Sequence, residues 1–122
     1  MPRTAGIRMA TGITAMIKRV LFICGKGRQR SPTAEQIFVS MPEWETDSAG
    51  LSADADIVVF SEQIDWATHI AVMEKRQIAR LKKTFPKLVS GKKIICLDVP
   101  DDFEFMQPEL IDLLQSRIGR VG

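Results

Sequence analysis

The sequence predicts an α/β domain in which a parallel sheet is covered by helices on both faces. Apolar segments of strand length alternate along the chain with segments whose apolar residues recur at helical spacing, which is the pattern of such folds. The 122 residues suit one compact domain. Neither an internal repeat nor a linker divides the chain, so we expect a single domain.

The first strand is predicted over residues 18–23, which contain the apolar run V-L-F-I. A helix follows up to about Met41, with Pro32 in its first turn, where the missing N–H of proline has no cost. A short second strand is predicted over 44–48 and is closed by Gly50. The buried face of the helix is marked by apolar residues at helical spacing: Ala34, Ile37, Phe38 and Met41.

The middle of the chain carries weaker signals. Residues 51–56 are turn-like, whereas 57–60 fit either a short strand or a buried crossover. Ser61 is predicted to be the N-cap of a brief helix that reaches Ala67. The run 69–73 is apolar enough to form a third strand.

The last third of the chain repeats the alternation. A helix is predicted from Glu74 to about Pro86, a fourth strand over 93–97 and a final helix over 108–118. Their buried faces are marked by apolar residues at helical spacing: Ile78, Leu81, Phe85, Leu110, Leu113 and Leu114.

Charge is strongly segregated along the chain, although the net charge is only +2. Residues 1–34 hold seven basic residues and no acidic one, whereas residues 94–116 hold six acidic residues and no basic one. A further basic group lies on and just after the predicted helix, over 75–87. Most of these charges are typical of solvated faces. The small net charge, and the lack of aromatic residues among the basic ones, argue against nucleic-acid binding.

The number of cysteines and the hydropathy of the chain indicate the compartment in which the protein is expected to work. The two cysteines, Cys24 and Cys96, are too few for a disulfide scaffold, and no metal-binding motif is present. No apolar run approaches the roughly 20 residues of a membrane span. We therefore expect a cytoplasmic protein, without metal or cofactor, and a monomer. Residues 1–17 are expected to be a disordered extension, or translation starts at Met16, ahead of a domain over 18–122.

In open parallel sheets, ligands bind beyond the carboxyl ends of the strands. The loops predicted at that edge are 24–31, 48–56, 73–75 and 98–107. The first of them is basic and the last is acidic. We therefore expect the basic loop and the acidic loop to meet at one place.

The segment 24–35 reads C-G-K-G-R-Q-R-S-P-T-A-E and combines a strand end, a glycine-containing loop and a helix start. Loops of this kind suit anions, because their backbone N–H groups point inward and the helix start adds partial positive charge. The glycines are misplaced for the G-x-x-x-x-G-K-[ST] nucleotide motif, and the dinucleotide motif lacks its third glycine. What remains is C-x5-R-S, an anion cradle formed by Gly25, Lys26, Gly27, Arg28 and Gln29 between a cysteine and an arginine.

The two ends of this loop can do chemistry on a phosphoryl group. Helix starts and nearby cations favour the thiolate form of a cysteine, and Cys24 has both. Arg30 offers a planar fork that suits two phosphate oxygens, and the Ser31 hydroxyl can stabilise the sulfur as it leaves. The alternative for Cys24 is a buried thiol at a strand end, which is the reading we favour for Cys96.

Transfer from a phosphate ester also needs an acid to protonate the leaving oxygen. The loop D-V-P-D-D-F offers Asp98, Asp101 and Asp102. Asp98 is nearest to the strand end and can be structural, whereas the other two lie farther out in the loop, where the neighbouring like charge would help to hold one of them protonated. The alternative is that both are solvated turn residues.

These residues resemble the low-molecular-weight protein tyrosine phosphatases, in particular their short bacterial branch. The resemblance extends from about Arg19 to Ile118. It is carried by four motifs: V-L-F-I-C-x5-R-S-P-T-A-E, D-S-A-G at 47–50, V-M-E-K at 72–75 and P-D-D-F at 100–103. It implies a four-stranded parallel sheet in the order 2-1-3-4.

The resemblance also implies roles for individual residues. Cys24 matches the nucleophile, Arg30 the phosphate-binding arginine, Ser31 the residue that stabilises the thiolate, and Asp101 the general acid of the family's D-P-[YF] motif. Asp102 stands where that motif has proline. We expect Asp102 and Phe103 to contact the substrate alongside the cradle.

Several positions depart from the family pattern. Gly27 replaces a mid-loop asparagine, so the left-handed backbone can be kept, but we expect Ser48 to lose the partner that this asparagine provides. Gln29 replaces the second cysteine that protects many members from oxidation. The chain has no tyrosine, so Phe103 and Phe105 would form the walls of the site.

Taken together, the residues and the resemblance predict a cysteine-dependent phosphomonoester hydrolase that acts on phosphotyrosine in proteins or on a small aryl phosphate. An anion-binding or regulatory module with a degenerate site is the main alternative. Arsenate reduction is a third, but that chemistry normally recruits further cysteines, and Cys96 lies in a predicted buried strand.

Overall fold

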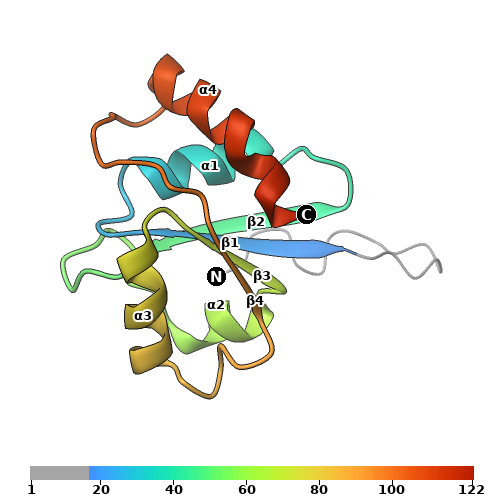
Figure 1. Ribbon diagram of the computed structural model, residues 1–122, viewed down its shortest axis with the longest axis vertical. Helices are drawn as coiled ribbons and strands as arrows, with labels where there is room; N and C mark the ends of the chain where they lie inside the picture. The colour runs from blue at the N-terminus through green and yellow to red at the C-terminus, as the bar shows by residue number, and fades with distance from the viewer. Residues whose placement is uncertain (1–16) are drawn as a thin grey trace.

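The structure is a computed structural model that describes residues 17–122. Four parallel strands form one sheet in the order β2-β1-β3-β4 (Figure 1), which confirms the predicted order. The strands are β1 (Lys18–Cys24), β2 (Trp44–Gly50), β3 (His69–Val72) and β4 (Lys93–Cys96). The helices are α1 (Arg30–Phe38), α2 (Ser61–Trp66), α3 (Lys75–Thr84) and α4 (Pro108–Arg117), and a 3-10 turn, η1 (Ile118–Val121), follows the last of them.

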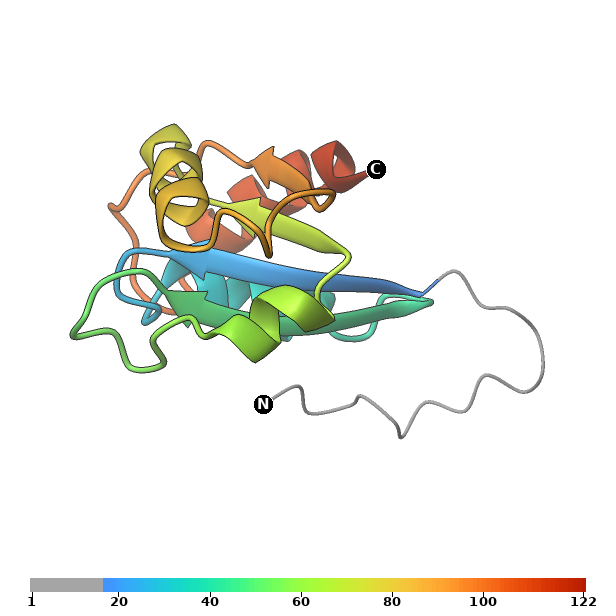
Figure 2. The same cartoon turned by 90° about the horizontal axis from the view of Figure 1, so that it is seen from below.

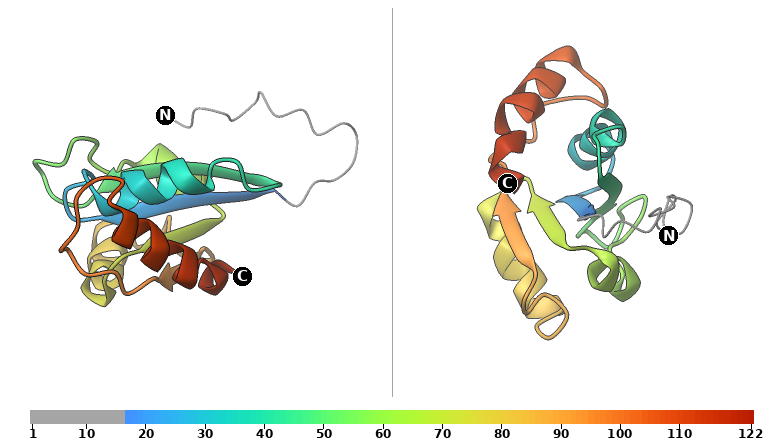
Figure 3. Two further views of the ribbon diagram at one scale, coloured as in Figure 1. Left: turned by 90° about the horizontal axis from the view of Figure 1, so that it is seen from above. Right: turned by 90° about the vertical axis from the view of Figure 1, so that its right-hand side faces the viewer.

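The helices cover both faces of the sheet, with α1 and α4 on one side and α2 and α3 on the other (Figure 3). The central strand β1 sends alternate residues into the two resulting cores. Phe22 and Cys24 lie in the core under α1 and α4, whereas Leu21 and Ile23 lie in the core over α2 and α3. Because both faces of β1 are covered from Val20 onward, its sequence from Val20 to Cys24 is continuously apolar and does not alternate. Figure 2 shows β1 and β2 as the long strands of the sheet, with β3 and β4 shorter.

Helix α1 differs from its predicted range at both ends. It begins at Arg30, so Pro32 is its third residue, where a backbone N–H would still have no partner within the helix. It ends at Phe38, three residues before Met41. Pro42 follows Met41 and disfavours helical geometry at the residue before it, which accounts for the early end. Met41 still packs against the core, from the loop after the helix.

The segment between β2 and β3 settles the weaker predictions. Strand β2 extends to Gly50, and residues 57–60 form a crossover with a single parallel bridge between Val58 and Gly50. The prediction that Ser61 caps α2 is wrong, because Phe60 is the N-cap. The backbone N–H of Phe60 donates to Gln63 Oε1 at 3.3 Å, and this side chain from inside the helix satisfies the start of α2.

The expected extension over residues 1–17 and the alternative start at Met16 concern residues outside those described, apart from Ile17. Among the helices of residues 17–122, none is both long enough and apolar enough to cross a membrane.

Candidate active site

The loop between β1 and α1 is held open by the segment that follows β2. Leu51, Ser52 and Asp56 donate their backbone N–H groups to the carbonyls of Cys24, Gly25 and Lys26 at 3.0, 2.8 and 3.2 Å. In a trans peptide the N–H points opposite to the carbonyl. The N–H groups that follow these carbonyls therefore face the inside of the loop. The segment 51–56 is in this sense a strap that turns the carbonyls outward and keeps the inner surface for an anion.

Cys24 lies at the floor of this cradle, where it is 2% exposed. Its sulfur accepts the backbone N–H of Gly27 at 3.1 Å and lies 3.1 Å from the Ser31 hydroxyl oxygen. Ser31 also reaches the carbonyl of Ala49 at 3.2 Å, so its hydroxyl can turn between that carbonyl and the sulfur. The Gly27 N–H donates to the sulfur, and the Ser31 hydroxyl can donate to it as well when it turns away from the Ala49 carbonyl.

Two glycines give the cradle its shape. Gly27 has the left-handed φ of +68°, as predicted for a residue that stands in for asparagine. A Cβ at Gly27 would lie 3.0 Å from the backbone nitrogen of Gly50, so the loop packs closely against β2. A Cβ at Gly50 would lie 2.7 Å from the carbonyl oxygen of Gly25, which leaves no room for any side chain there. The position of the cradle therefore depends on glycine at both sites.

Arg30 is the first residue of α1, and its side chain is only 3% exposed. Its Nη1 donates to Glu74 Oε2 at 2.6 Å and to the carbonyl of Val99 at 2.7 Å. These bonds come from the loops after β3 and β4, and they fix the plane of the guanidinium. The anchoring uses one nitrogen, so the edge formed by Nε and Nη2 is the one that a phosphoryl group could take.

Glu74 connects Arg30 to the surface. Its second carboxylate oxygen accepts Nε of Arg76 at 2.7 Å, so one carboxylate joins two guanidinium groups. Partial burial acts to raise the pKa of Glu74, but the hydrogen bonds from Arg30 and Arg76 outweigh it and hold the pKa below its usual value. Glu74 therefore stays ionised and keeps Arg30 in place over a wide pH range.

The acidic loop after β4 brings one of its three aspartates to the cradle. Asp101 Oδ1 lies 3.7 Å from Arg30 Nε, and the Asp101 side chain is 62% exposed. Asp98 turns away, because its carboxylate pairs with Arg120 at 3.0 Å and its pKa is lowered by that contact. Asp102 is exposed on the same loop. The Asp101 carboxylate therefore lies beside Arg30 at the cradle, whereas the Asp98 carboxylate lies beside Arg120.

The prediction that the basic loop meets the acidic loop is confirmed at Arg30. Arg30 meets the loop after β4, but the side chains of Lys26 and Arg28 pair with the strap. The Lys26 ammonium lies 2.6 Å from Asp54, and the Arg28 guanidinium lies 2.9 Å from Asp56. The hydrogen bond from Lys26 lowers the pKa of Asp54 to about 2, and the hydrogen bond to Asp56 raises the pKa of Arg28. Lys26 and Arg28 thus border the cradle through their backbone while their charges are neutralised outside it.

Without a side chain at Gly27, Ser48 has no partner in the loop, but it has another partner and is not left idle. The Ser48 hydroxyl donates to Glu35 Oε1 at 2.6 Å, and Glu35 is buried on α1. Next to it, Asp47 accepts the backbone N–H of Ser48 at 2.9 Å and the side-chain amide of Gln63 at 3.1 Å. This buried polar network ties α1 and α2 to the end of β2 that supports Gly27.

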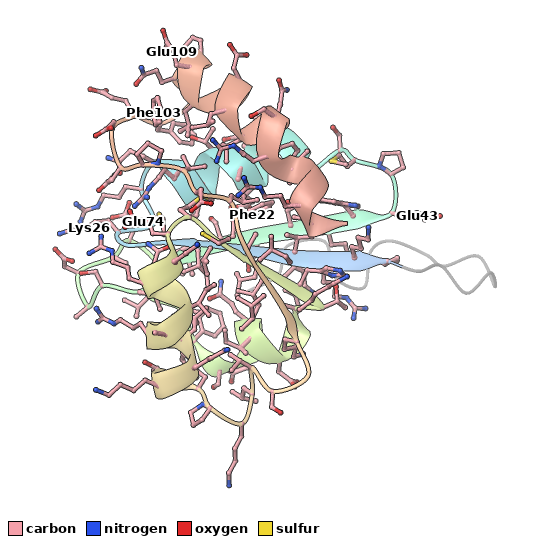
Figure 4. All side chains as sticks on the ribbon, viewed as in Figure 1. Phe22, Lys26, Glu43, Glu74, Phe103 and Glu109 are labelled. Carbon is pink, nitrogen blue, oxygen red and sulfur yellow. The ribbon has the colours of Figure 1, made fainter. Side chains whose placement is uncertain are left out.

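Sequence reasoning assigned no role to Glu74 or Glu35, although both lie within motifs that it singled out. The available signal for Glu74 was its position directly after the apolar run of β3, at the carboxyl edge of the sheet. Figure 4 shows Lys26, Glu74 and Phe103 at this one end of the molecule, and Glu43 at the opposite end. No comparable signal existed for Glu35, since a glutamate in a helix is ordinarily solvated.

The remaining predicted site residues lie around the cradle. Gln29 is the N-cap of α1, and its carbonyl accepts the N–H of Thr33 at 3.1 Å. Phe103 is half-buried and packs against the core under α1 and α4. Phe105 is 48% exposed and lines a hollow of about 350 Å³ beside Gly27, across from Ile57. Of the two aromatic residues, Phe105 has the more open face.

The second cysteine belongs to the other face of the sheet. Cys96 is half-buried and packs against the core over α2 and α3, whereas Cys24 is buried in the core under α1 and α4. Partial burial raises the pKa of the Cys96 thiol, which donates to Asp98 Oδ1 at 3.3 Å. The sheet therefore separates the two sulfurs. Across residues 17–122 there is also no group of three or more His, Cys, Asp or Glu side chains that could hold a metal ion.

No protein-family model and no curated protein sequence matches this chain. Solved structures do match. The YwlE arginine phosphatase from Geobacillus stearothermophilus is 21% identical, with a TM-score of 0.66 over 85% of this chain and 88% of its own. The chain has the low-molecular-weight phosphatase fold. The tyrosine phosphatase Wzb from Escherichia coli K30, in complex with phosphate, is 17% identical, with a TM-score of 0.66 over 87% of this chain and 94% of its own. Vibrio vulnificus Wzb, in complex with benzylphosphonate, is 19% identical, with a TM-score of 0.67 over 86% of this chain and 94% of its own.

At these identities the likeness shows the fold, and it confirms the fold that the sequence motifs implied. The low-molecular-weight phosphatase fold places the loop after its first strand at the same sheet edge as the loops after β3 and β4, as seen at the left of Figure 1. The chemistry that this chain can perform there follows from its own side chains.

Proposed function

We propose that the protein hydrolyses phosphomonoesters through a cysteinyl-phosphate intermediate, with phosphotyrosine in proteins as the substrate. One observation carries the proposal. The Cys24 sulfur lies among the Gly27 N–H, the Ser31 hydroxyl and the inward face of a loop whose carbonyls are strapped outward. A buried arginine stands at the other end of that loop. This arrangement offers a nucleophile and an anion site at the same point.

In the first step, the Cys24 thiolate attacks phosphorus and the bond from phosphorus to the ester oxygen breaks. Charge gathers on the three equatorial oxygens, where the backbone N–H groups of the cradle and the free edge of Arg30 can hold it. Asp101, as the carboxylic acid, gives its proton to the leaving oxygen. Its position 3.7 Å from Arg30 Nε puts it beside the phosphoryl site and open to solvent, where the leaving group departs.

In the second step, a water molecule attacks the cysteinyl phosphate. Asp101, now a carboxylate, takes a proton from the water, and the bond between sulfur and phosphorus breaks. Inorganic phosphate leaves, and the sulfur returns to the thiolate, which Ser31 and the Gly27 N–H stabilise. Every step uses side chains and backbone of the chain, so the mechanism assigns no role to a cofactor.

The substrate class follows from the depth and the walls of the site. Cys24 lies at the floor of the cradle and Phe105 lines the hollow beside it, which suits a phosphate carried on an aromatic ring. The similar structures support a phosphorylated protein, since YwlE is described as an arginine phosphatase and Wzb as a tyrosine phosphatase. A thiolate nucleophile requires a reducing compartment, so we propose that the protein is cytoplasmic. We also propose that it is a monomer.

Two other functions compete. A degenerate anion-binding module is the alternative suggested by Gly27 and Asp102, the two departures from the family motif. The left-handed Gly27 keeps the shape of the loop, which anion binding and catalysis both need, so a turnover assay decides between them. Arsenate reduction needs a cysteine that can resolve an intermediate on Cys24. Cys96 is on the opposite face of the sheet and cannot supply it in the folded chain.

Hydrolysis of p-nitrophenyl phosphate tests the proposal. We expect turnover that persists in EDTA, is blocked by vanadate and disappears in Cys24→Ser, which keeps the size of the side chain and removes the thiolate. The matched control is Cys96→Ser, which should retain activity. Equal activity of Cys24→Ser and wild type would contradict the proposed mechanism. Tight binding of inorganic phosphate without hydrolysis of any aryl phosphate would identify the binding module instead.

A further inference from the structure

A second hollow lies next to the cradle, on the side opposite to Phe105. It measures about 270 Å³ and opens between the strap and the first turns of α3. Its wall includes Gly25, the residue directly after the nucleophile. The lining residues are Gly25, Leu51, Ser52, Arg76, Gln77 and Arg80. Gly25 and Cys24 are adjacent in the chain, so a group bound against Gly25 would lie beside a phosphate held over Cys24.

The hollow is positively charged. Arg76 and Arg80 are four residues apart and face it from the same side of α3. None of the six lining residues is acidic. The nearest carboxylates are already engaged: Asp54 with Lys26, and Glu74 with both Arg30 and Arg76. Arg76 shares the Glu74 carboxylate with Arg30, whereas Arg80 has no carboxylate within ion-pair distance among residues 17–122. Arg80 is therefore the cation of the hollow that is not neutralised, unlike Arg28 on the other side of the cradle.

Both arginines keep donors for a ligand. Arg76 uses Nε for Glu74, and its side chain is 79% exposed. Arg80 reaches the carbonyl of Leu51 with one nitrogen at 3.4 Å, which is a long and weak bond. Each guanidinium has five N–H donors, so these contacts leave most of them for an anion entering the hollow.

We propose that this hollow is a second anion subsite, which selects substrates with an acidic group beside the phosphorylated residue. The proposal rests on the proposed phosphatase function and adds a substrate class to it. The ligand is an anionic oxygen group within reach of Gly25. Either the carboxylate of a neighbouring acidic residue or a second phosphoryl group has this chemistry. Arg80 and Arg76 bind it through charge-assisted hydrogen bonds, while the cradle holds the phosphate that is removed.

Three phosphotyrosine peptides that differ only in the adjacent residue test the subsite: one with glutamate, one with phosphoserine and one with alanine. We expect wild-type kcat/KM to be about tenfold higher for the two acidic peptides, as one charge-assisted hydrogen bond predicts. Arg80→Glu should remove this preference. A preference for both peptides shows that a carboxylate suffices, and a preference for the phosphoserine peptide alone shows that the ligand is a phosphoryl group.

Lys83→Glu is the matched control, because it makes the same charge change on α3 at an exposed residue that does not line the hollow. The ratio of kcat/KM between acidic and alanine peptides should stay within about twofold of wild type in this variant. Equal turnover of all three peptides by wild type would overturn the subsite, as would an equal loss of preference in both variants. Failure to hydrolyse any peptide would count against the phosphatase function. Calorimetric binding of the same peptides would then test the subsite separately, with the same ranking expected.

Discussion

Arg28 and Arg30 lie two residues apart on the same loop but in opposite surroundings. The Arg28 side chain is 45% exposed and pairs with Asp56 on the strap. The Arg30 side chain is 3% exposed and is anchored by Glu74 and the Val99 carbonyl. Both are cations next to an anion cradle, and the C-x5-R-S spacing singles out Arg30 but does not show which groups hold either side chain. The structure assigns the charge of Arg28 to holding the strap and that of Arg30 to the inside of the site.

The cradle therefore has two edges: an outer edge at Lys26 and Arg28, which holds the strap, and an inner edge at Arg30, which faces the site. Its outer edge is fixed by exposed ion pairs, of a kind that contributes little in water. Its inner edge is fixed by a buried ion pair, which is costly to break because one charge would remain buried without a partner. Substitutions on the inner edge should therefore change catalysis far more than substitutions on the outer edge.

Arg30→Lys is expected to cause the largest loss. Lysine keeps the charge but lacks the planar fork, so it cannot contact Glu74 and two phosphoryl oxygens together. We expect kcat/KM for p-nitrophenyl phosphate to fall by about 10³ to 10⁵, the range for an arginine that stabilises transferring phosphoryl groups. Circular dichroism of the variant should match wild type. A loss below tenfold would show that Arg30 acts only through its charge.

Asp101→Asn tests the acid at the inner edge. We expect kcat to fall by about 10² to 10⁴, the range for loss of general acid catalysis. Asp102→Asn, one residue on and exposed, is the control and should lose much less. With an aryl phosphate whose leaving group is very acidic, the difference in kcat between wild type and Asp101→Asn should become smaller, because the leaving oxygen needs no proton. The reverse ranking of the two variants would assign the role to Asp102.

The chemistry of the inner edge was largely predictable from sequence, because its residues lie close together in the chain. The strand end at Cys24, the glycines and the helix start all fall within one loop and its flanks. Strand β1 was also predictable, because Val20–Cys24 is buried on both faces and is continuously apolar. The topology then brings the carboxyl ends of the strands to one edge, which placed Asp101 near the cradle.

The side-chain partners of the loop's cations were not predictable, because they lie far away in the sequence. Asp54 and Asp56 each lie 28 residues after the cation with which they pair. Asp54 and Asp56 sit in a segment with neither strand nor helix periodicity, so nothing local fixes where their side chains point. The contact between Glu74 and Arg30 joins residues 44 positions apart and depends on the side-by-side pairing of β1 and β3. Such pairings emerge only once the sheet is assembled.

Glu74→Gln should have an intermediate effect. Glutamine can accept one hydrogen bond from Arg30 but leaves its buried charge without a counter-charge. We expect kcat/KM to fall by about 10- to 100-fold, because the guanidinium is less well oriented. Glu35→Gln is a matched control, since it alters another carboxylate of this end of the molecule that contacts Ser48 and not Arg30. A larger loss in Glu35→Gln than in Glu74→Gln would contradict the anchoring role.

The difference in stability between wild type and Glu74→Gln should depend on pH. The folded-state pKa of Glu74 lies below its usual value, so its contribution to stability is present above about pH 4.3, the unfolded value. It is lost as the pH falls through the lower folded-state pKa. Denaturation of wild type and Glu74→Gln should therefore differ most near neutral pH and converge in acid. A stability difference that stays constant down to pH 2 would exclude ionised Glu74 as its source.

The smallest effect is expected at the outer edge, in the double variant Lys26→Gln and Arg28→Gln. These residues border the cradle through their backbone, and their side chains pair with Asp54 and Asp56 on the strap. We expect kcat/KM for p-nitrophenyl phosphate to change by less than about threefold, as is typical of exposed ion pairs. Asp56→Asn sharpens the comparison, because it removes the carboxylate that pairs with Arg28. The freed cation should attract the substrate and lower the KM for p-nitrophenyl phosphate slightly at low salt. A loss in the double variant as large as that of Arg30→Lys would mean that both edges of the cradle hold the phosphate through their side chains, and that the division between them is wrong.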